Sequence, residues 1–285
     1  MTSLKTAVSK PYKAVLARTP PALALRVEYY RRLRRFPNLR NPTLFTEKSQ
    51  VAKLTDRNPL LPIMVDKVRV KDFVSERLGP DWVTPTIWHG PELPARADHD
   101  WPLPFVIKVN HVSGGNFFVR TPEECDWPTI ENAVNALLSR PYEPHTVQWA
   151  YNSIPRQALV EPYIGDVAAA PVDYKLFVFH GRVEFIEVDT DRATQHKRAF
   201  YDRAWKLQPF ALQYPLETRP IPRPKSLNEM IAAAELLAGA APFLRIDFYE
   251  ISGQPLFGEI SQFPDGGMGR FDPPAYDKVL GDLWR

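Results

Sequence analysis

Thirty prolines in a chain of 285 residues limit the helices and strands of this sequence to short ones. Proline lacks a backbone N–H and fixes its φ angle, so it ends helices and is excluded from central strands. No period of about 20 to 50 residues repeats, which argues against a solenoid. The chain is 44% hydrophobic and 12% aromatic, enough for one large core or two smaller ones. We therefore expect a folded protein built from many short elements.

Basic residues are concentrated at the N-terminus. Residues 1–40 contain ten Lys or Arg residues and one acidic residue, Glu28, whereas the whole chain has a net charge of only +3. The arginines interleave with apolar residues, a pattern typical of a basic amphipathic helix. Such a helix either packs on the main domain with a solvated basic face or contacts an anionic membrane peripherally. We do not expect nucleic acid as a partner, because the remaining residues are net acidic and form no known binding module.

Cysteine content and hydropathy limit the kinds of site and the cellular location that we expect. Cys125 is the one cysteine and has no metal-ligand neighbours, so neither a disulfide framework nor a zinc site is supported. The longest apolar run, residues 230–244, is interrupted by Glu235 and Pro242 and is too short to cross about 30 Å of hydrocarbon. No signal-peptide pattern opens the chain. We expect a cytoplasmic location, peripheral to the inner face of the plasma membrane if residues 1–40 contact it.

Turn and cap residues predict a mixture of helices and antiparallel strands. A helix is expected over residues 62–78, ending at Gly79, with Lys67 on its apolar stripe. A capping box of Ser226 and Glu229 predicts another helix, which ends near Gly239. Strands are expected over residues 105–110, 117–120 and 158–164, and in two hairpins, of residues 174–179 with 183–188 and of residues 243–251 with 255–261. The elements lack a βαβ rhythm, so the predicted fold class is α+β with antiparallel sheets.

The strand at residues 243–251 carries a candidate metal site. Period-two alternation sends Arg245 and Asp247 to the same face. If the following hairpin loop has three residues, Asp247 lies opposite Glu259, and Ser261 follows two residues on. Two carboxylates and one hydroxyl are oxygen ligands of the kind that Mg²⁺ prefers. The alternative is a solvated hairpin face on which Arg245 pairs with Asp247 or Glu259.

A second group of residues has the chemistry of a phosphate site. The turn before residue 117 consists of Ser113, Gly114, Gly115 and Asn116. Its backbone N–H groups could approach phosphate oxygens. Lys108 precedes it within the hydrophobic run FVIKVN, and Lys175 lies in the similar run DYKLFV; a buried ammonium needs a nearby anion. The turn alone is weak evidence, because most Gly-Gly turns are structural and the chain has no GxxxxGKS/T or GxGxxG motif.

The order of these residues along the chain resembles the ATP-grasp enzymes. The resemblance is carried by Lys108, the SGGN turn, Glu161, Asp173-Tyr-Lys175, Arg245-Ile-Asp247 and Gly-Glu259-Ile-Ser261. More closely, the segments PTLFTEKSQ, DKVRVKDFV, KVNHVSGGN, DYKLFVFHG and GEISQFPDGG resemble the TupA-like ATP-grasp family of bacterial polysaccharide biosynthesis, over roughly residues 36–284. Such enzymes hold ATP between the antiparallel sheets of two α+β subdomains, phosphorylate a carboxylate and let an amine attack the acyl phosphate.

The resemblance also implies how the chain is divided. A basic helical segment is expected at residues 1–40 and a helical region preceding the nucleotide fold at residues 41–104. The N-terminal ATP-grasp subdomain would occupy residues 105–165. The C-terminal subdomain, with the metal site, would occupy residues 166–285.

Carried over by position, the resemblance assigns roles to individual residues. Lys67 and Lys108 would hold the phosphates, and the turn from Ser113 to Asn116 would close over them. The residues implied at the adenine end are Glu161, Tyr163 and Ile164.

Further roles fall at the reacting end of the nucleotide. Lys175, preceded by Asp173, would contact the γ-phosphate, and Arg245 would steady the charge that develops on transfer. One or two Mg²⁺ ions, for which Mn²⁺ could substitute, would be held by Asp247, Glu259 and Ser261.

Three positions depart from the pattern or leave it open. Ser261 stands where asparagine is usual, so the third metal ligand is the least secure of the set. Val112 stands where relatives tend to have glycine, which would stiffen the turn. His111 beside it is more often structural than catalytic in such a setting.

The acceptor site is marked by fewer residues. Asp189-Thr-Asp191-Arg192 and His196-Lys197-Arg198 fall where a loop could face the cleft, and their cations would suit a uronate carboxylate. A charged solvated loop is the alternative.

The function implied is ATP-dependent amide formation between an amine or amino acid and a sugar acid of a surface polysaccharide or its precursor. The alternatives are a sugar or glycan kinase, a glycosyltransferase-associated enzyme, and a nucleotide-binding scaffold without catalysis. The sequence predicts no oligomeric state.

Overall fold

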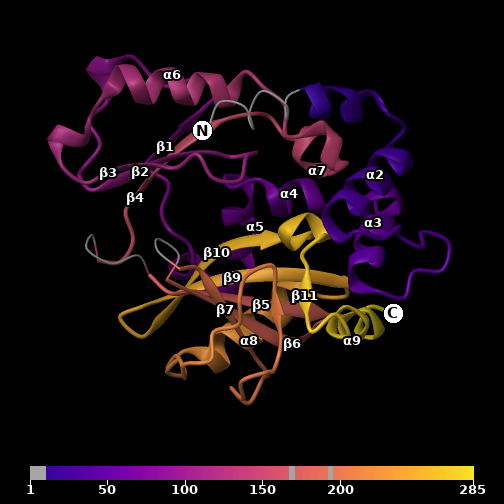
Figure 1. The fold of residues 1–285 in the computed structure, drawn as a ribbon. Coiled ribbons are helices and arrows are strands. Elements are labelled where there is room, and N and C mark those ends of the chain that lie inside the picture. Colours follow the sequence, from indigo (N-terminus) through magenta and orange to yellow (C-terminus); the bar gives the residue numbers. More distant parts are fainter. Residues whose placement is uncertain (1–10, 167–170, 192–194) are drawn as a thin grey trace.

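The computed structural model describes residues 11–166, 171–191 and 195–285, in which short helices and strands follow one another (Figure 1). Residues 11–18 are helical. The helices that follow are α2 (Pro21–Leu33), α3 (Phe45–Thr55), α4 (Leu61–Val65), α5 (Arg69–Leu78), α6 (Trp127–Leu138), α7 (Trp149–Asn152), α8 (Leu227–Ala238) and α9 (Tyr276–Leu283). The strands are β1 (Trp88–Gly90), β2 (Phe105–Val109), β3 (Phe117–Val119), β4 (Ala158–Pro162), β5 (Asp173–Phe179), β6 (Arg182–Thr190), β7 (Lys197–Tyr201), β8 (Ala211–Leu212), β9 (Phe243–Ile251), β10 (Gln254–Ser261) and β11 (Phe271–Asp272).

Two antiparallel sheets form the two halves of the fold. One has the strand order β1-β4-β2-β3 and the other the order β10-β9-β5-β6-β7. Figure 1 shows the four-stranded sheet at the top beneath α6, and the five-stranded sheet below it with α8 on its far side. The predicted α+β class with antiparallel sheets is confirmed, and each expected strand is found to within two residues at either end.

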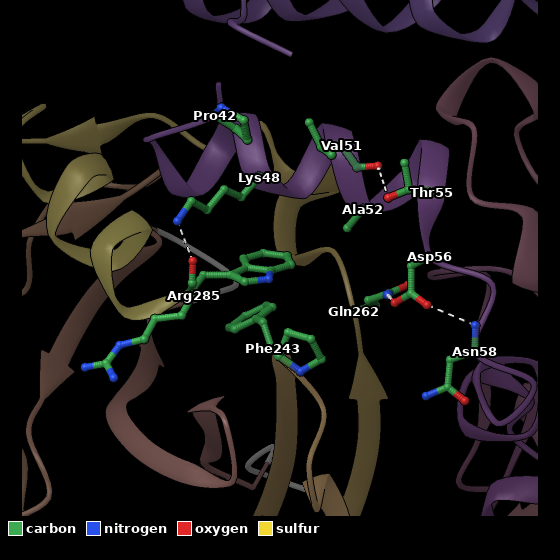
Figure 2. A pocket seen from close by; sticks show the side chains of 12 residues that line it. Pro42, Lys48, Val51, Ala52, Thr55, Asp56, Asn58, Phe243, Gln262 and Arg285 are labelled. Carbon is green, nitrogen blue, oxygen red and sulfur yellow. Dashed lines mark hydrogen bonds between the residues drawn. The ribbon is translucent and has the colours of Figure 1, made fainter. Parts of the chain in front are cut away.

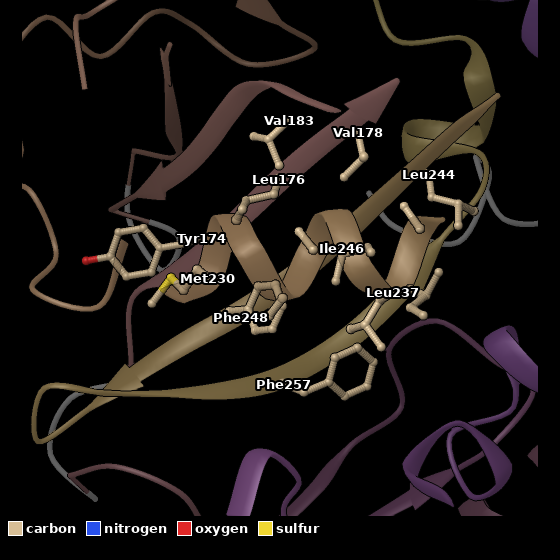
Figure 3. Packing of buried hydrophobic residues seen from close by; sticks show 14 of the residues in the cluster. Tyr174, Leu176, Val178, Val183, Met230, Leu237, Leu244, Ile246, Phe248 and Phe257 are labelled. Carbon is tan, nitrogen blue, oxygen red and sulfur yellow. The ribbon is translucent and has the colours of Figure 1, made fainter. Parts of the chain in front are cut away.

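One face of the five-stranded sheet packs on α8. Leu244, Ile246 and Phe248 alternate along β9 and are at most 1% exposed. They meet Met230 and Leu237 of α8 in one apolar cluster (Figure 3). Truncating such a buried aromatic side chain to alanine typically costs about 3–5 kcal/mol, so this face anchors the sheet.

The opposite face of the same sheet is divided into an aromatic half and a charged half. In the aromatic half, Phe177, Phe200 and Phe243 pack against Phe45 of α3 and Trp284, which follows α9. In the charged half, alternate positions of the same strands carry Asp173, Lys175, Glu187, Asp189, Arg245 and Asp247. Charged side chains so deep in a sheet must be paired with each other or with a ligand.

The helix predicted over residues 62–78 is wrong, because the chain breaks into α4 and α5. Asp66 is extended (ψ 112°), and its Oδ1 accepts hydrogen bonds from the Val68 N–H and from Asn110 Nδ2, both at 3.0 Å. An aspartate that bonds the backbone two residues on competes with the helix. Lys67 therefore lies in a turn rather than on a helical stripe, whereas Gly79 ends α5 as expected.

The capping box predicted at Ser226 is also wrong. The Ser226 hydroxyl donates to Glu250 Oε2 at 2.7 Å, and the Ser226 N–H donates to the same oxygen at 2.8 Å. A tertiary carboxylate has replaced the local cap, although α8 still begins after Ser226 and ends at Gly239.

The basic segment at residues 1–40 packs on the body of the protein through α2. Leu25 and Tyr29 are fully buried beside Met268. Arg31 and Arg32 pair with Glu28 of the same helix at 2.5 and 3.0 Å. Residues 1–10 of the segment lie outside the described residues. Within the part of the chain that is described, no helix has the length and apolar character needed to cross a membrane.

Candidate active site

Four charged residues form a row across the five-stranded sheet. In the strand register, Glu259 lies opposite Asp247, Asp247 opposite Lys175, and Lys175 opposite Glu187. Cross-strand neighbours have their Cβ atoms about 4.5–5.5 Å apart, so adjacent members of the row are within reach of one another. The sheet therefore brings together residues that are 84 positions apart in sequence, counted from Lys175 to Glu259.

A bulge at Gly258 sets the alignment of Asp247 with Glu259. The hairpin turn has two residues, because Ile251 pairs with Gln254, and the register then shifts between Phe257 and Glu259. A Cβ atom at Gly258 would lie 3.1 Å from the Asp247 carbonyl oxygen, which favours glycine there. The three-residue loop of the sequence prediction is thus wrong, but the pairing it was meant to produce is present.

Arg245 holds the two carboxylates of the candidate metal site. Its Nε and one terminal nitrogen donate to the two oxygens of Asp247 at 2.7 and 2.6 Å, and the same terminal nitrogen donates to Glu259 Oε1 at 2.7 Å. Arg245 and Asp247 are 7% and 2% exposed, whereas the Glu259 side chain is 48% exposed, so the hairpin face is solvated only at Glu259, and the predicted pairing of Arg245 is present. Burial alone would lower the pKa of Arg245, but Asp247 and Glu259 raise it well above its usual value.

The oxygen atoms of this cluster fit a hard divalent cation. Asp247 and Glu259 converge on one guanidinium nitrogen, and Ser261 Oγ lies 3.3 Å from Glu259 Oε1. Two carboxylates and a hydroxyl match the ligands of Mg²⁺ that also binds substrate phosphates. Among the described residues, no group of three or more His, Cys, Asp or Glu side chains could hold a metal ion. A site here therefore depends on the Ser261 hydroxyl as well as the two carboxylates.

Lys175 is buried in the middle of the row and is surrounded by carboxylates. Its Nζ pairs with Asp173 Oδ2 and lies 3.2 Å from Asp189 Oδ2. Burial alone would lower the pKa of Lys175, but Asp173 and Asp247 outweigh it and raise the pKa. The lysine is therefore a fixed positive charge beside the candidate metal ligands.

Lys108 and Glu161 form an ion pair between neighbouring strands of the four-stranded sheet. Lys108 Nζ donates to Glu161 Oε2 at 2.6 Å, and Lys71 of α5 pairs with the other oxygen, Oε1. Lys71 also donates to Thr86 Oγ1 at 2.7 Å. Sequence reasoning missed Lys71, because nothing in a run of alternating basic and apolar residues marks which cation points inward.

Lys67 holds the backbone that leads into the glycine turn. Its Nζ donates to the Val112 carbonyl at 2.6 Å and the Asn110 carbonyl at 3.3 Å. Burial lowers the pKa of Lys67, while the carboxylate of Glu259 opposes that shift. Lys67 therefore holds the backbone before the glycine turn and feels the charge of Glu259.

The glycine turn itself is exposed. Ser113, Gly114, Gly115 and Asn116 are all solvent-accessible. Gly114 and Gly115 have φ angles of 74° and 69°, a region that other residues rarely adopt, so two glycines are required there.

The two residues beside the turn are buried. Val112 is 8% exposed, and His111 is fully buried with its Nε2 3.0 Å from the Arg140 carbonyl. That contact ties His111 to the body of the subdomain.

The predicted adenine end lies where β4 leaves the four-stranded sheet. Tyr163 donates its N–H to the Pro104 carbonyl at 2.9 Å, so this N–H is not available to a base, while Ile164 is half-buried. The Tyr163 ring packs edge-on against Phe118 at 5.8 Å. Residues 167–170, which connect this end to β5, lie outside the described residues.

Of the residues predicted at the acceptor side, Asp189, His196 and Arg198 form a largely buried network, whereas Asp191 is exposed. Asp189 Oδ1 lies 2.8 Å from both His196 Nε2 and Arg198 Nε. Arg198 also pairs with Asp265 at 2.6 Å and so is not a free cation for a carboxylate. Burial raises the pKa of neighbouring Glu187 to about 7. The predicted Arg192 lies outside the described residues.

A pocket of about 380 Å³ adjoins the end of β10 (Figure 2). Its lining includes the rings of Phe243 and Trp284. Gln262, which directly follows Ser261, donates to Asp56 Oδ2 at 2.6 Å across it, and Lys48 donates to the Gly281 carbonyl at 2.9 Å. None of the residues predicted to bind the nucleotide or the metal, all of which are described, lines this pocket.

Comparisons with known proteins agree with this architecture. The family model described as TupA-like ATPgrasp matches residues 47–285. Among solved structures, the L-amino acid ligase from Bacillus licheniformis is similar at a TM-score of 0.51 with 12% identity, over 84% of this chain and 55% of that protein. The D-alanine–D-alanine ligase from Bacillus anthracis complexed with ATP is similar at a TM-score of 0.45 with 16% identity, over 78% of this chain and 65% of that protein.

The family match and the similarity to the L-amino acid ligase confirm the predicted ATP-grasp fold. The chain spans between about half and two thirds of the length of the two solved ligases. A search of the curated proteins found no match to the chain.

Proposed function

We propose that this chain, which belongs to the TupA-like ATP-grasp family, is an ATP-dependent carboxylate–amine ligase that forms an amide through an acyl phosphate. The observation that carries the proposal is the row of Glu259, Asp247 and Lys175 with Arg245 beside it. It sets two oxygen ligands next to two fixed cations, which suits binding and transfer of a phosphoryl group. A protein that only bound a nucleotide would have no need for this combination.

We assign the residues as follows. Lys67 and Lys108 bind the phosphates beneath the turn of Ser113 to Asn116, and Glu161 with the backbone of Tyr163 and Ile164 borders adenine. Lys175, fixed by Asp173, contacts the γ-phosphate, and Arg245 steadies the transferring group. Asp247, Glu259 and Ser261 would hold one or two Mg²⁺ ions, for which Mn²⁺ could substitute, and the metal would supply positive charge to the phosphates.

The reaction balances in two steps. A carboxylate oxygen attacks the γ-phosphorus of ATP, the bond to the bridging oxygen breaks, and ADP leaves. The amine nitrogen then attacks the carbonyl carbon, the carbon–oxygen bond to phosphate breaks, and inorganic phosphate leaves with the amide formed. The residues of the row supply orientation and charge for the first step, in which negative charge gathers on the transferred group.

We further propose that the carboxylate is a uronic acid of a surface polysaccharide or its precursor, and that the amine is an amino acid or a simple amine. Within this scheme the ATP-grasp subdomains are residues 105–165 and 166–285, preceded by the helical region at residues 41–104 and the basic segment at residues 1–40.

The surface of α2 supports a peripheral membrane contact for such an enzyme. Leu23, Val27 and Tyr30 recur at helical spacing and are 50%, 38% and 44% exposed. Arg26 and Arg34 lie at exposed positions along the same stripe. Apolar and cationic residues on one exposed helical face suit an anionic lipid surface. We therefore propose that the protein works at the inner face of the plasma membrane.

Nucleotide turnover with purified protein tests the ligase proposal. ATP and magnesium are supplied with a panel of uronic acids and amino acids, and ADP, AMP and phosphate are separated. We expect ADP and phosphate only when an acid and an amine are both present, with loss of turnover in Glu259→Ala but not in the matched control Glu229→Ala on the exposed face of α8. ADP with a stable phosphorylated sugar would identify a kinase instead, and ATP binding without turnover would favour a scaffold.

A further inference from the structure

His196 and Asp189 form a hydrogen-bonded pair beside the charged row. His196 precedes β7, and its Nε2 lies 2.8 Å from Asp189 Oδ1 on β6. Its ring stacks at 3.7 Å on Tyr214, which is 38% exposed. The His196 side chain is 19% exposed, so a small solute can reach it, whereas that of Asp189 is 2% exposed. The pair thus joins a buried carboxylate to an accessible imidazole.

One carboxylate connects this imidazole to Lys175. Asp189 Oδ2 lies 3.2 Å from Lys175 Nζ, while Oδ1 accepts from His196. The two nitrogens are separated by no more than two hydrogen bonds and the width of one carboxylate. An acyl phosphate resting on Lys175, together with the amine that attacks it, is long enough to span this separation and reach the imidazole ring, whose Nδ1 lies on the edge away from Asp189.

The charge around the pair favours a cation. The groups that face it are Asp189 and Glu187 from β6, Arg198 from β7, Lys175 and Asp173 from β5, and Asp265 from the loop after β10. Three ionised carboxylates, and Glu187 with its pKa raised by burial to about 7, surround two cations. Both oxygens of Glu187 are buried and lack a hydrogen-bond partner among the described residues, although Arg198 Nε lies 3.1 Å from one of them. Such a surplus attracts an ammonium rather than a carboxylate.

The hydrogen bond to Asp189 also fixes the tautomer of the neutral imidazole. Lys175 and Arg198 outweigh the effect of burial and lower the pKa of Asp189, so this carboxylate is ionised and can only accept a hydrogen bond. Nε2 must then carry the proton, which leaves the lone pair on Nδ1. No hydrogen-bond partner of Nδ1 lies among the residues that the structure describes.

We propose that His196 is the general base that deprotonates the amine co-substrate and that Asp189 is its positioning residue. This inference rests on the proposed ligase function. An ammonium has no lone pair, so it cannot attack the acyl phosphate until Nδ1 takes one of its protons. The freed nitrogen then forms the bond to carbon while the carbon–oxygen bond to phosphate breaks, and the remaining extra proton leaves with phosphate. Asp189 stabilises the imidazolium formed in this step.

A pair of nucleophiles separates this role from a structural one. An amino acid is protonated at neutral pH and needs the base, whereas hydroxylamine is largely neutral at pH 7 and does not. For His196→Gln we expect amide formation to slow by about 100-fold or more. Hydroxamate formation from the same uronic acid should stay within threefold of wild type, with KM for ATP unchanged. His180→Gln, an exposed histidine on the β5–β6 turn, is the matched control and should leave both rates unaltered.

The other outcomes of this comparison distinguish failure of the His196 role from failure of the ligase proposal. Equal slowing with both nucleophiles, or unaltered amide formation in His196→Gln, would overturn the role of His196 while leaving the ligase intact. A wild-type protein that forms neither amide nor hydroxamate would instead refute the ligase proposal, and this inference with it.

A measurement without substrate tests the pair directly. Nitrogen-15 NMR of the histidine side chains, assigned with His196→Gln, should place the proton of neutral His196 on Nε2. Asp189→Asn removes the carboxylate that accepts from Nε2, so the proton should no longer be confined to that nitrogen. A proton on Nδ1 in the wild-type protein, or a tautomer that Asp189→Asn leaves unchanged, would overturn the inference.

Discussion

Replacing Lys71 with methionine tests how the charges of Lys71, Glu161 and Lys108 depend on one another. The Glu161 side chain is 6% exposed, and each of its oxygens has its own lysine: Lys108 at 2.6 Å on one and Lys71 on the other. Methionine keeps the apolar stem but removes the ammonium. A hydrogen bond to a charged group contributes about 1.5–3 kcal/mol, so we expect the free energy of unfolding to fall by about that amount. Lys278→Met, at a side chain that is 59% exposed, should change it by less than about 0.5 kcal/mol.

The same substitution should weaken ATP binding. Lys108 can turn toward a phosphate only if Lys71 keeps Glu161 neutralised, because an unpaired buried carboxylate is costly. In Lys71→Met, Lys108 would have to neutralise Glu161 and bind a phosphate of ATP at the same time. We expect the dissociation constant for ATP, measured by calorimetry, to rise about tenfold, which corresponds to about 1.4 kcal/mol. Lys71→Arg should recover most of that loss.

The difference in stability between wild type and Lys71→Met should depend on pH in a defined direction. Burial alone would raise the pKa of Glu161, but Lys108 and Lys71 outweigh it and the pKa is lowered. A carboxylate with a lowered pKa stabilises the fold above its unfolded pKa of about 4.3, and that contribution is lost as pH falls through the folded value. The stability gap between wild type and Lys71→Met should therefore be full at pH 7 and shrink below about pH 4. Unchanged stability and ATP affinity, or a gap that persists at low pH, would refute the reasoning.

Three further predictions concern other parts of the molecule. Gly258→Val should lower the free energy of unfolding by about 1–3 kcal/mol and abolish turnover, because a Cβ there meets the Asp247 backbone at 3.1 Å; normal denaturation and activity would contradict this. Burial lowers the pKa of Lys53 to about 7, so the unfolded chain binds more protons between pH 7 and 10 and wild-type stability should rise across that range. Lys53→Met should flatten the curve, and a wild-type curve already flat would count against the burial argument. Val27→Asp with Tyr30→Asp should reduce cosedimentation with phosphatidylserine vesicles at unchanged melting temperature, and equal binding would remove the membrane proposal.

Local patterns predicted the strands well, because period-two alternation and turn residues act within a few positions. The facing of Arg245 and Asp247, for example, follows from alternation alone. The predictions failed where a distant partner overrode a local preference. Asn110 and the backbone share Asp66, which breaks the helix of residues 62–78, and Glu250 draws Ser226 away from its cap.

In the candidate site, too, the features that depend on contacts between distant residues were not predicted. The order of lysines and carboxylates was enough to select Lys108, Lys175 and Glu259 by resemblance. Lys71 was not selected, because its contact with Glu161 depends on how α5 lies against β4. The bulge at Gly258 was also missed, since a glycine inside a strand does not by itself reveal a register shift.

Transfer of oxygen from the carboxylate to phosphate tests the central claim most directly. The uronic acid is labelled with oxygen-18 in its carboxyl group and incubated with ATP, magnesium, an amine and the wild-type protein. Activation through an acyl phosphate predicts one labelled oxygen in each inorganic phosphate released, in amounts that match the amide. Label recovered in AMP, or phosphate released without label, would contradict the account.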